Sequence, residues 1–148
     1  LMRSSDTHLD FDLELAKKAS ADNPVFYIQY AHARICSIFR TATEQGIKLR
    51  DSVDIDLSPL KNEEEFVMIK KILSFTEIIE KSAELLEVHR VAFYLQDLVG
   101  TFHRYYSRNR IVSDDHALSF ARLFLMNCLR ITICNGLSIM GVSSPERM

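Results

Sequence analysis

The segment from Asp115 to Asn135 constrains the fold more than any other part of the chain, because it is apolar on nearly every side. A helix with that pattern is buried in a protein core or in a membrane. The run is almost long enough to span a bilayer, but Arg122, Asn127 and Arg130 argue against a membrane helix. We therefore expect the central helix of a bundle, which ends at Gly136.

Apolar periodicity and capping residues place further helices before it. Apolar residues that recur three or four positions apart make residues 88–106 a strongly amphipathic helix. Asn23 and Pro24 are typical of a helix start, so a first long helix should run to Gln45 and stop at Gly46. Neither the alternation typical of strands nor a long repeat is present. The expected fold class is all-α, a helical bundle of about five helices.

The middle of the chain supplies a pair of shorter helices. Asn62, followed by a run of glutamates, gives the second helix a cap and a first turn that suits its dipole. Ser74 stands before Glu77 in the pattern of a new capping box, so we expect a break there and a third helix to about Glu87. Residues 47–61 lack a helical period and predict a functional or mobile loop.

A stripe of Tyr27, Tyr30 and Arg34 lies beside the apolar face of the first long helix. The apolar face itself comprises Ile28, Ala31, Ile35, Ile38 and Ala42. Two phenols and a guanidinium at this spacing are well placed to stack on nucleobases and to hold a phosphate. Tyrosines that only rim a core have the same pattern, so the spacing leaves both interpretations open.

The formal charge of −2 gives the chain no overall basic character that would indicate a nucleic-acid partner. Residues 51–87 are rich in acids, whereas residues 88–130 are rich in arginines. One half could therefore face phosphates while the other is solvated, although charged helix faces are more often simply solvated.

Three cysteines, Cys36, Cys128 and Cys134, form no paired motif. That pattern suits free thiols in a reducing compartment, most simply the cytoplasm. Residues 1–12 are acidic and lack the apolar segment of a signal peptide. His32 and Cys36 lie one helical turn apart and could share a metal, but such a pair without further ligands is more often packing, so we expect no metal site.

No catalytic apparatus is recognisable in the sequence. A glycine-rich phosphate loop, a nucleophile elbow and a paired metal motif are all missing. His89 and His103 lie on similar faces of one helix, where helix entry, packing or RNA contact would explain them. The residues therefore favour recognition over catalysis.

Three separate stretches carry a family resemblance, and they follow one another in the right order. The residues NPVFYIQYAHARICS at 23–37 resemble the opening helix of the DALR-type anticodon-binding domain of arginyl-tRNA synthetases. Residues 88–112 resemble the long helix and exit loop of that domain, and residues 117–148 resemble its last helix and tail. The ending GVSSPERM is the most specific match, because in that family the chain stops at this methionine.

The resemblance implies a division of the chain and a parent enzyme. Residues 1–20 would be the tail of a catalytic unit or a linker, and residues 21–148 the anticodon-binding domain. The parent would be an arginine–tRNA ligase, a class I synthetase that uses ATP with Mg²⁺. Its HIGH and KMSKS motifs are absent here, so this fragment is expected to hold no cofactor and not to be catalytic alone. We expect a cytoplasmic monomer that binds arginine-specific tRNA and no membrane.

The resemblance also implies a site for the anticodon. Tyr27, Tyr30 and Arg34 would supply aromatic faces and a cation around its central cytosine. Met148 would add an apolar contact, with its terminal carboxylate nearby. A second set of residues would contact phosphates, although a plain surface role explains them equally well: Arg104, Arg108 and Arg110.

The chain departs from the family pattern in two places. Where the name-giving Asp-Ala-Leu-Arg run would fall, it has DHALS at residues 115–119, with Arg122 the nearest substitute for the arginine. Val88 stands where many members have a proline before His89 and Arg90. These departures put local helix starts in doubt and leave the proposed base contacts untouched.

Two alternatives stay open at this stage. The related domain of another synthetase, such as the cysteine enzyme, is disfavoured by the ending PERM. A helical protein-interaction module without an RNA role would instead use the tyrosine stripe to dock a partner helix. Salt separates the two classes, because binding to RNA weakens steeply with salt whereas an apolar helix contact does not.

Overall fold

The computed structural model of the protein describes residues 13, 14, 20, 22–47 and 55–148. The regular structure of these residues is helical, which confirms the all-α prediction. The long helices are α2 (Pro24–Glu44), α3 (Glu63–Leu73), α4 (Phe75–Glu84), α5 (His89–Arg108) and α6 (His116–Ile139).

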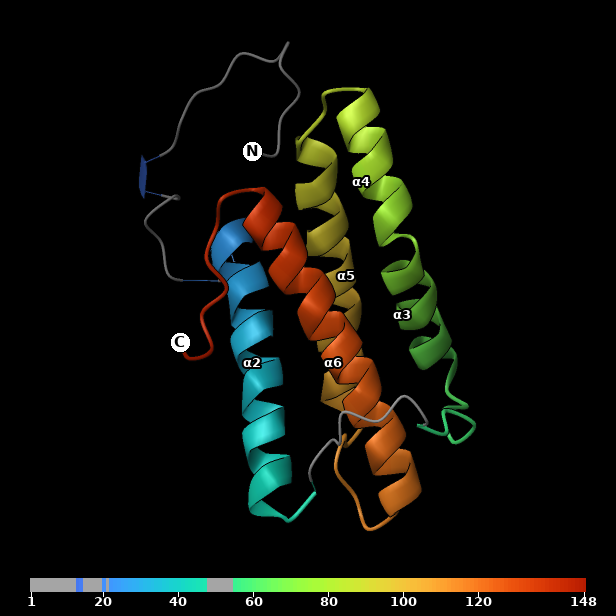
Figure 1. Cartoon of the computed structure of the whole chain (residues 1–148). Coiled ribbons are helices and arrows are strands. Elements are labelled where there is room, and N and C mark those ends of the chain that lie inside the picture. The colour runs from blue at the N-terminus through green and yellow to red at the C-terminus, as the bar shows by residue number, and fades with distance from the viewer. Residues whose placement is uncertain (1–12, 15–19, 21, 48–54) are drawn as a thin grey trace.

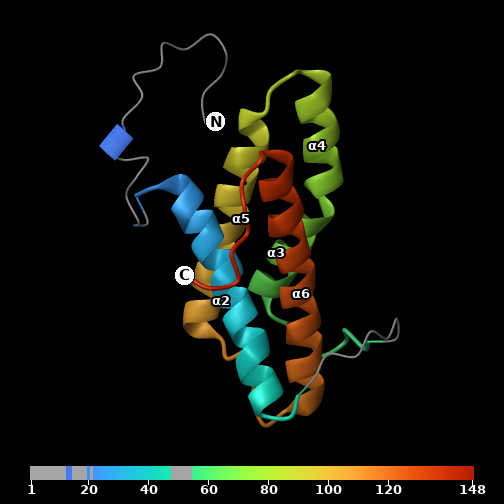
Figure 2. The same cartoon turned by 60° about the vertical axis from the view of Figure 1, so that its left-hand side comes forward.

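The helices form a bundle in which α5 and α6 lie in the middle (Figure 1). Helix α2 packs against both of them on one side, and the consecutive pair α3 and α4 covers the other side. After α6 the chain turns back and runs along α2, as Figure 2 also shows. This return places the last residues of the chain beside the middle of α2.

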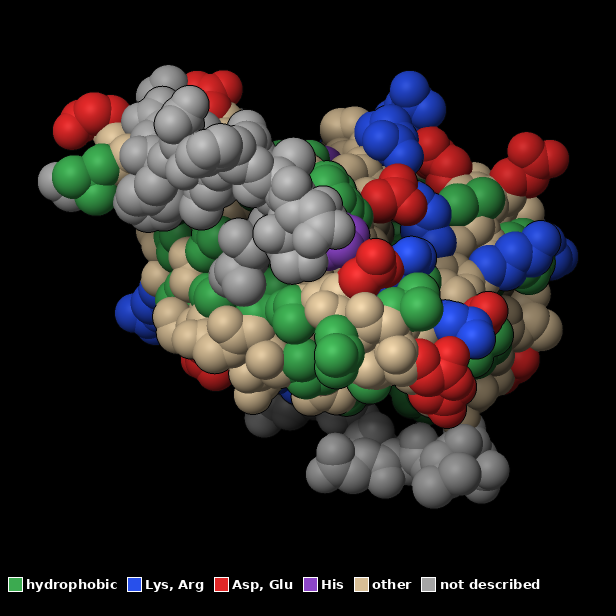
Figure 3. Space-filling model, turned by 90° about the horizontal axis from the view of Figure 1, so that it is seen from above, with side chains coloured by type: hydrophobic (Ala, Val, Ile, Leu, Met, Phe, Trp, Pro, Cys, Tyr) green, Lys and Arg blue, Asp and Glu red, His purple; other side chains and the backbone are tan. Residues whose placement is uncertain are grey.

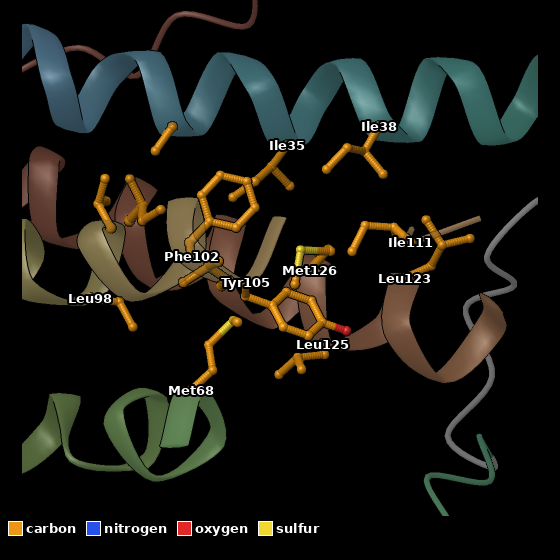
Figure 4. Packing of buried hydrophobic residues seen from close by; sticks show 14 of the residues in the cluster. Ile35, Ile38, Met68, Leu98, Phe102, Tyr105, Ile111, Leu123, Leu125 and Met126 are labelled. Atoms are coloured by element: carbon orange, nitrogen blue, oxygen red, sulfur yellow. The ribbon is translucent and has the colours of Figure 1, made fainter. Parts of the chain in front are cut away.

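The core lies where α2, α3, α5 and α6 meet, and Figure 4 shows its buried side chains. The predicted apolar face of α2 is buried there, from Ile28 to Ala42. Helix α6 is long and apolar enough to be a possible membrane span by length and composition, the possibility against which Arg122 and its polar neighbours argued in the sequence. Its buried side chains pack on the other helices, as those of a core helix do.

Two of the predicted helix starts are confirmed by their caps. The side chain of Asn23 accepts hydrogen bonds from the backbone N–H groups of Val25 and Phe26. Asn62 and Glu65 form a complete capping box at the start of α3. Because these caps involve only near neighbours in the chain, the sequence alone was enough to place them.

The third helix differs from its prediction in two ways. The break at Ser74 is confirmed, but its side chain makes no cap bond, and its Oγ donates backward to the carbonyl of Lys71 at 2.8 Å. The helix also ends at Glu84, before the predicted Glu87. Leu86 has a φ of +54°, a left-handed conformation that ends a helix sharply.

The predicted end of the last helix at Gly136 is wrong. Helix α6 continues to Ile139, and the left-handed turn is made by Gly141, with a φ of +70°. Gly136 is buried inside the helix, and a Cβ atom there would lie 2.8 Å from Leu95 Cδ2 of α5. The glycine is therefore a point of close contact between two helices and not a helix stop.

A buried ionic cluster ties α3 to the two central helices. The carboxylate of Glu65, which is fully buried, accepts hydrogen bonds from Tyr105 Oη and from Arg122 Nε at 2.8 Å. Arg122 also donates to the carbonyl of Arg110. The start of α6, which the departure from the family pattern put in doubt, is capped by Asp115.

Two predictions fall partly outside the described residues. The expected loop at 47–61 includes residues 48–54, which are not described, but Ile47 and Leu60 at its ends are buried in the core. Residue 21 and most of the residues before it (1–12 and 15–19) are not described either, so the expected domain boundary between residues 20 and 21 lies outside the described residues.

Candidate nucleic-acid interface

Helix α2 presents the predicted stripe on its surface at successive turns. Tyr27 and Arg34 are half-buried, and Tyr30 is exposed. Arg34 lies one turn after Tyr30, so its Nη2 donates a hydrogen bond to Tyr30 Oη at 2.6 Å. The guanidinium carbon of Arg34 lies 4.7 Å from the centre of the Tyr30 ring, which is a cation–π contact.

Helix α5 adds His103 and Tyr106 to this stripe. The ring of His103 lies 4.9 Å from that of Tyr27 and 6.0 Å from that of Tyr30, measured between ring centres. The guanidinium carbon of Arg34 also lies 5.3 Å from the centre of the Tyr106 ring. Packing of α5 on α2 therefore surrounds one cation with aromatic rings from both helices.

The carboxyl-terminal segment brings Met148 to the same place. Gln29 Nε2 donates to the carbonyl of Ser143 at 2.8 Å, and His32 Nδ1 donates to that of Pro145 at 2.9 Å. Arg40 Nη1 donates to the carbonyl of Glu146 at 3.3 Å. These bonds hold the segment along α2, as its path in Figure 2 shows.

Two hollows share Tyr30 and Arg34. The Met148 hollow, of about 400 Å³, is lined by Tyr30, Ala33, Arg34, Ser37, Arg40, Tyr106, Arg147 and Met148. The His103 hollow, of about 380 Å³, is lined by Phe26, Tyr27, Tyr30, Arg34 and His103. The structure thus brings three of the predicted residues, Tyr30, Arg34 and Met148, into one hollow and places Tyr27 in the next.

The two hollows differ in charge. Arg34, Arg40 and Arg147 line the Met148 hollow, and among the described residues that line it none has an acidic side chain, so the terminal carboxylate of Met148 is the one acidic group of these lining residues. In the His103 hollow, burial first and then the charge of Arg34 lower the pKa of His103 to about 4. His103 is therefore a neutral aromatic ring at neutral pH, and Arg34 is the cation of that hollow.

The three arginines predicted to contact phosphates lie in different surroundings. Arg104 is exposed and donates to Thr101 Oγ1, whereas Arg108 pairs with Glu64 on α3 at 3.1 Å. Arg110 lines another hollow, which it shares with Tyr106 and the second half of α2. Of the three, Arg110 is therefore the one placed beside the Met148 hollow, because the hollow that it lines shares Ser37 and Tyr106 with the Met148 hollow.

The sequence suggested one acidic and one basic half, but the packing of the helices brings acidic and basic side chains together. Glutamates of α3 pair with arginines of the later helices, Glu64 with Arg108 and Glu65 with Arg122. Figure 3, which looks down on the bundle from the top of Figure 1, shows acidic and basic side chains intermixed on the side of α4. The cations around the Met148 hollow are thus a local feature.

The pair His32 and Cys36 serves packing in this structure. Cys36 Sγ lies 3.9 Å from His32 Nδ1, which donates to Pro145. Burial raises the pKa of the Cys36 thiol, which disfavours the thiolate that a metal would need. Among the described residues there is no group of three or more potential ligands that could hold a metal ion.

Sequence reasoning missed several residues of this surface. Phe26 precedes Tyr30 by one turn, and the two rings are nearly parallel with centres 6.4 Å apart. Tyr106 was assigned only to the apolar periodicity of its helix, although it follows His103 by one turn. For Arg40 and Arg147 the sequence holds no signal, because their approach depends on the path of the last residues.

Comparison with known proteins identifies similar chains over the whole length. The family model described as DALR anticodon binding domain matches residues 28–148. An arginine–tRNA ligase of Symbiobacterium thermophilum is 53% identical over 148 residues, which are 100% of this chain and 26% of that protein. One of Syntrophotalea carbinolica is 49% identical, over 100% of this chain and 27% of that protein.

Solved structures agree with this similarity. The arginyl-tRNA synthetase of Thermus thermophilus matches 93% of this chain and 23% of its own, with a TM-score of 0.77 and 30% identity. A chain from Campylobacter jejuni matches 99% of this chain and 31% of its own, with a TM-score of 0.85 and 28% identity. The chain spans about a quarter of the length of the curated relatives.

Proposed function

The chain belongs to the DALR anticodon-binding domain family, and on that premise we propose that it binds the anticodon loop of arginine-specific tRNA. The parent protein would be an arginine–tRNA ligase, which joins arginine to its tRNA at the expense of ATP, with Mg²⁺ as the metal. Residues 21–148 would form the anticodon-binding domain and hold the tRNA, while the chemistry takes place in another part of the parent protein. That parent protein would be a cytoplasmic monomer.

The observation that carries the proposal is the joint position of Tyr30, Arg34 and Met148. These three side chains come from α2 and from the last residue, and they line one hollow. A base that leaves the stack of an RNA loop can lie against the Tyr30 ring and the guanidinium plane of Arg34. Each such stack is worth about 1–3 kcal/mol. Met148 would close the hollow with an apolar contact.

Selectivity would come from the polar groups of the same hollow. The arginines offer hydrogen-bond donors for the ring-nitrogen and carbonyl acceptors of cytosine, and the hydroxyl of Ser37, which can also accept, would suit its amino group. A base with donors at those positions would leave buried polar groups unpaired, which is costly. We therefore expect the Met148 hollow to bind the central base of the anticodon and to select its identity.

Affinity would come from phosphate contacts around the hollow. Arg40 and Arg147 line it, and Arg110 lies beside it next to Tyr106. Arg104 and Arg108 are retained as weaker candidates, since Arg108 already pairs with Glu64. Phosphate contacts make affinity depend steeply on salt.

The alternative function, a helical protein-interaction module without an RNA role, lacks support from the relatives, which are arginine–tRNA ligases.

Binding to a synthetic anticodon stem–loop tests the proposal. We expect the chain to prefer the arginine stem–loop to one of unrelated anticodon, with an affinity that falls steeply as salt is raised. Tyr30→Ala or removal of Met148 should weaken binding roughly 5- to 100-fold, because each removes a wall of the hollow. Fluorescence anisotropy gives the affinities, and circular dichroism checks that helicity is unchanged.

Phe93→Ala is the matched control, because Phe93 is an exposed aromatic residue on α5 that lines neither hollow. It should bind RNA as the wild type does. Equal affinities of the wild type, Tyr30→Ala and the chain without Met148 would reject the proposed site.

A further inference from the structure

The His103 hollow has the shape of a second ligand site next to the first. Its volume of about 380 Å³ is close to the 400 Å³ of the Met148 hollow, and both lie in the range of small-molecule sites. Tyr30 and Arg34 line both hollows, so the two hollows are adjacent at these side chains. Ligands in the two hollows would therefore share the same two side chains as neighbours.

The chemistry of the His103 hollow suits a flat, uncharged ring. Phe26, Tyr27, Tyr30 and the neutral His103 supply four aromatic side chains, and Arg34 is the one cation among the lining residues. Arg34 is already engaged with the rings of Tyr30 and Tyr106. A phosphate would find few donors here, whereas a nucleobase would find aromatic faces on several sides.

Two of the polar atoms of this hollow, on His103 and Tyr30, are poorly placed to read a base edge. His103 Nε2 is buried and makes no hydrogen bond among the described residues, so a ligand in the hollow does not reach it without a shift of the ring. Tyr30 Oη already accepts a hydrogen bond from Arg34. Contact through the faces of the rings is tolerant of sequence, because every base has such a face.

We propose that the His103 hollow is a second base subsite, which holds a nucleotide adjacent to the one in the Met148 hollow by stacking and without selecting its identity. This inference rests on the proposed function, since it assigns a further part of the same RNA loop. It divides the surface into a selective hollow lined by three arginines and a tolerant hollow lined by aromatic rings.

The test combines variants of the chain with changes in the RNA loop. The protein is the full chain as wild type, Phe26→Ala, His103→Ala and His103→Phe, with Phe93→Ala as the matched control on α5. The RNA is the arginine anticodon stem–loop, with an abasic residue at each loop position in turn, and with each base exchange on either side of the central base. Affinity is measured by anisotropy and helicity by circular dichroism.

We expect Phe26→Ala and His103→Ala to weaken binding of the intact loop roughly 5- to 100-fold, the range of one lost stack. His103→Phe should bind as the wild type does, because it keeps a flat wall. With the abasic residue at one position next to the central base, Phe26→Ala should cause no further loss. Base exchanges at that position should change affinity less than about threefold, well below one lost stack.

Three results would overturn the subsite. Wild-type affinity of both alanine variants, with Tyr30→Ala still weak, would leave the hollow empty and the proposed function intact. An equal loss for Phe26→Ala with every abasic RNA would mean that it acts through the fold. Strong dependence on base identity, or weak binding by His103→Phe, would contradict stacking alone. Failure of the wild type to prefer the arginine loop would instead reject the proposed function.

Discussion

Glu65 offers the sharpest test of what holds this bundle together. Its side chain is 0% exposed and that of Arg122 is 13% exposed, so their ion pair is buried. Glu65 Oε1 accepts from Tyr105 Oη at 2.5 Å and from Arg122 Nε at 2.8 Å, and Oε2 accepts from the backbone of Asn62 at 3.1 Å. One carboxylate thus joins α3, α5 and α6.

Glu65→Gln keeps the shape and removes the charge. The amide oxygen can still accept from Tyr105 and Arg122, but the amide nitrogen would meet the N–H of Asn62, a second donor. Breaking a buried pair by changing one partner costs about 3–5 kcal/mol. We expect about 3 kcal/mol, because one acceptor remains and Arg122 also donates to the carbonyl of Arg110.

A loss of that size is large for a single domain, whose whole stability is about 5–15 kcal/mol. It should lower the Tm by roughly 6–12 °C for a chain of this length. Urea unfolding followed by circular dichroism measures the free energy, and Glu64→Gln is the control. Glu64 pairs with Arg108 at the surface, so its replacement should cost less than about 1 kcal/mol.

A double-mutant cycle decides whether the cost comes from the pair. Glu65→Gln and Arg122→Met should show an interaction energy above about 1 kcal/mol, because each variant removes one charge of the same ion pair. If the two costs add within about 0.5 kcal/mol, the ion pair is not the source and the reasoning fails.

Two further predictions concern the contact of α5 with its neighbours. Gly136→Ala should lower the free energy of unfolding in urea by about 1–3 kcal/mol, because its Cβ would lie 2.8 Å from Leu95. Gly100→Ala is the control and should raise that free energy by about 0.5–1 kcal/mol, because its Cβ would lie 3.6 Å from the nearest atom. A Gly136→Ala variant as stable as the wild type would contradict the reasoning. The lowered pKa of His103 means that the unfolded chain binds this proton first as the pH falls, so the contribution of His103 to stability is complete above about pH 6.5 and is lost toward pH 4. The free energy of unfolding should fall by up to about 1.4 kcal/mol per pH unit, and partial exposure of the ring should roughly halve this slope. His103→Phe should flatten that fall, and an unchanged slope would argue against it.

Much of the fold could be predicted because its signals are local. The caps at Asn23 and Asn62 and the break at Ser74 depend on residues within one turn, and the structure has helices that begin or end there. Gly136 could not be predicted in this way. A glycine near the end of an apolar run has the same local sequence pattern whether it ends the helix or allows another helix to pack closely against it. Only the position of Leu95 distinguishes the two.

The candidate site divides in the same way. The common face of Tyr27, Tyr30 and Arg34 follows from helical geometry, so the sequence was sufficient to group them. The sequence did not show that Tyr27 faces the His103 hollow while Tyr30 also faces Met148. Nor did it show that Arg108 would be held by Glu64, a residue on another helix.

By itself the sequence determined the helices, their starts and the stripe of aromatic and basic side chains on α2, because each depends on spacing along one helix. The tertiary structure alone decided that α5 places His103 and Tyr106 against that stripe, and it supplied the path along α2 by which Met148 reaches the site that the family resemblance implied. The physical reason is that a hollow needs walls from segments far apart in the chain, and only the packing of the core sets the distance between them.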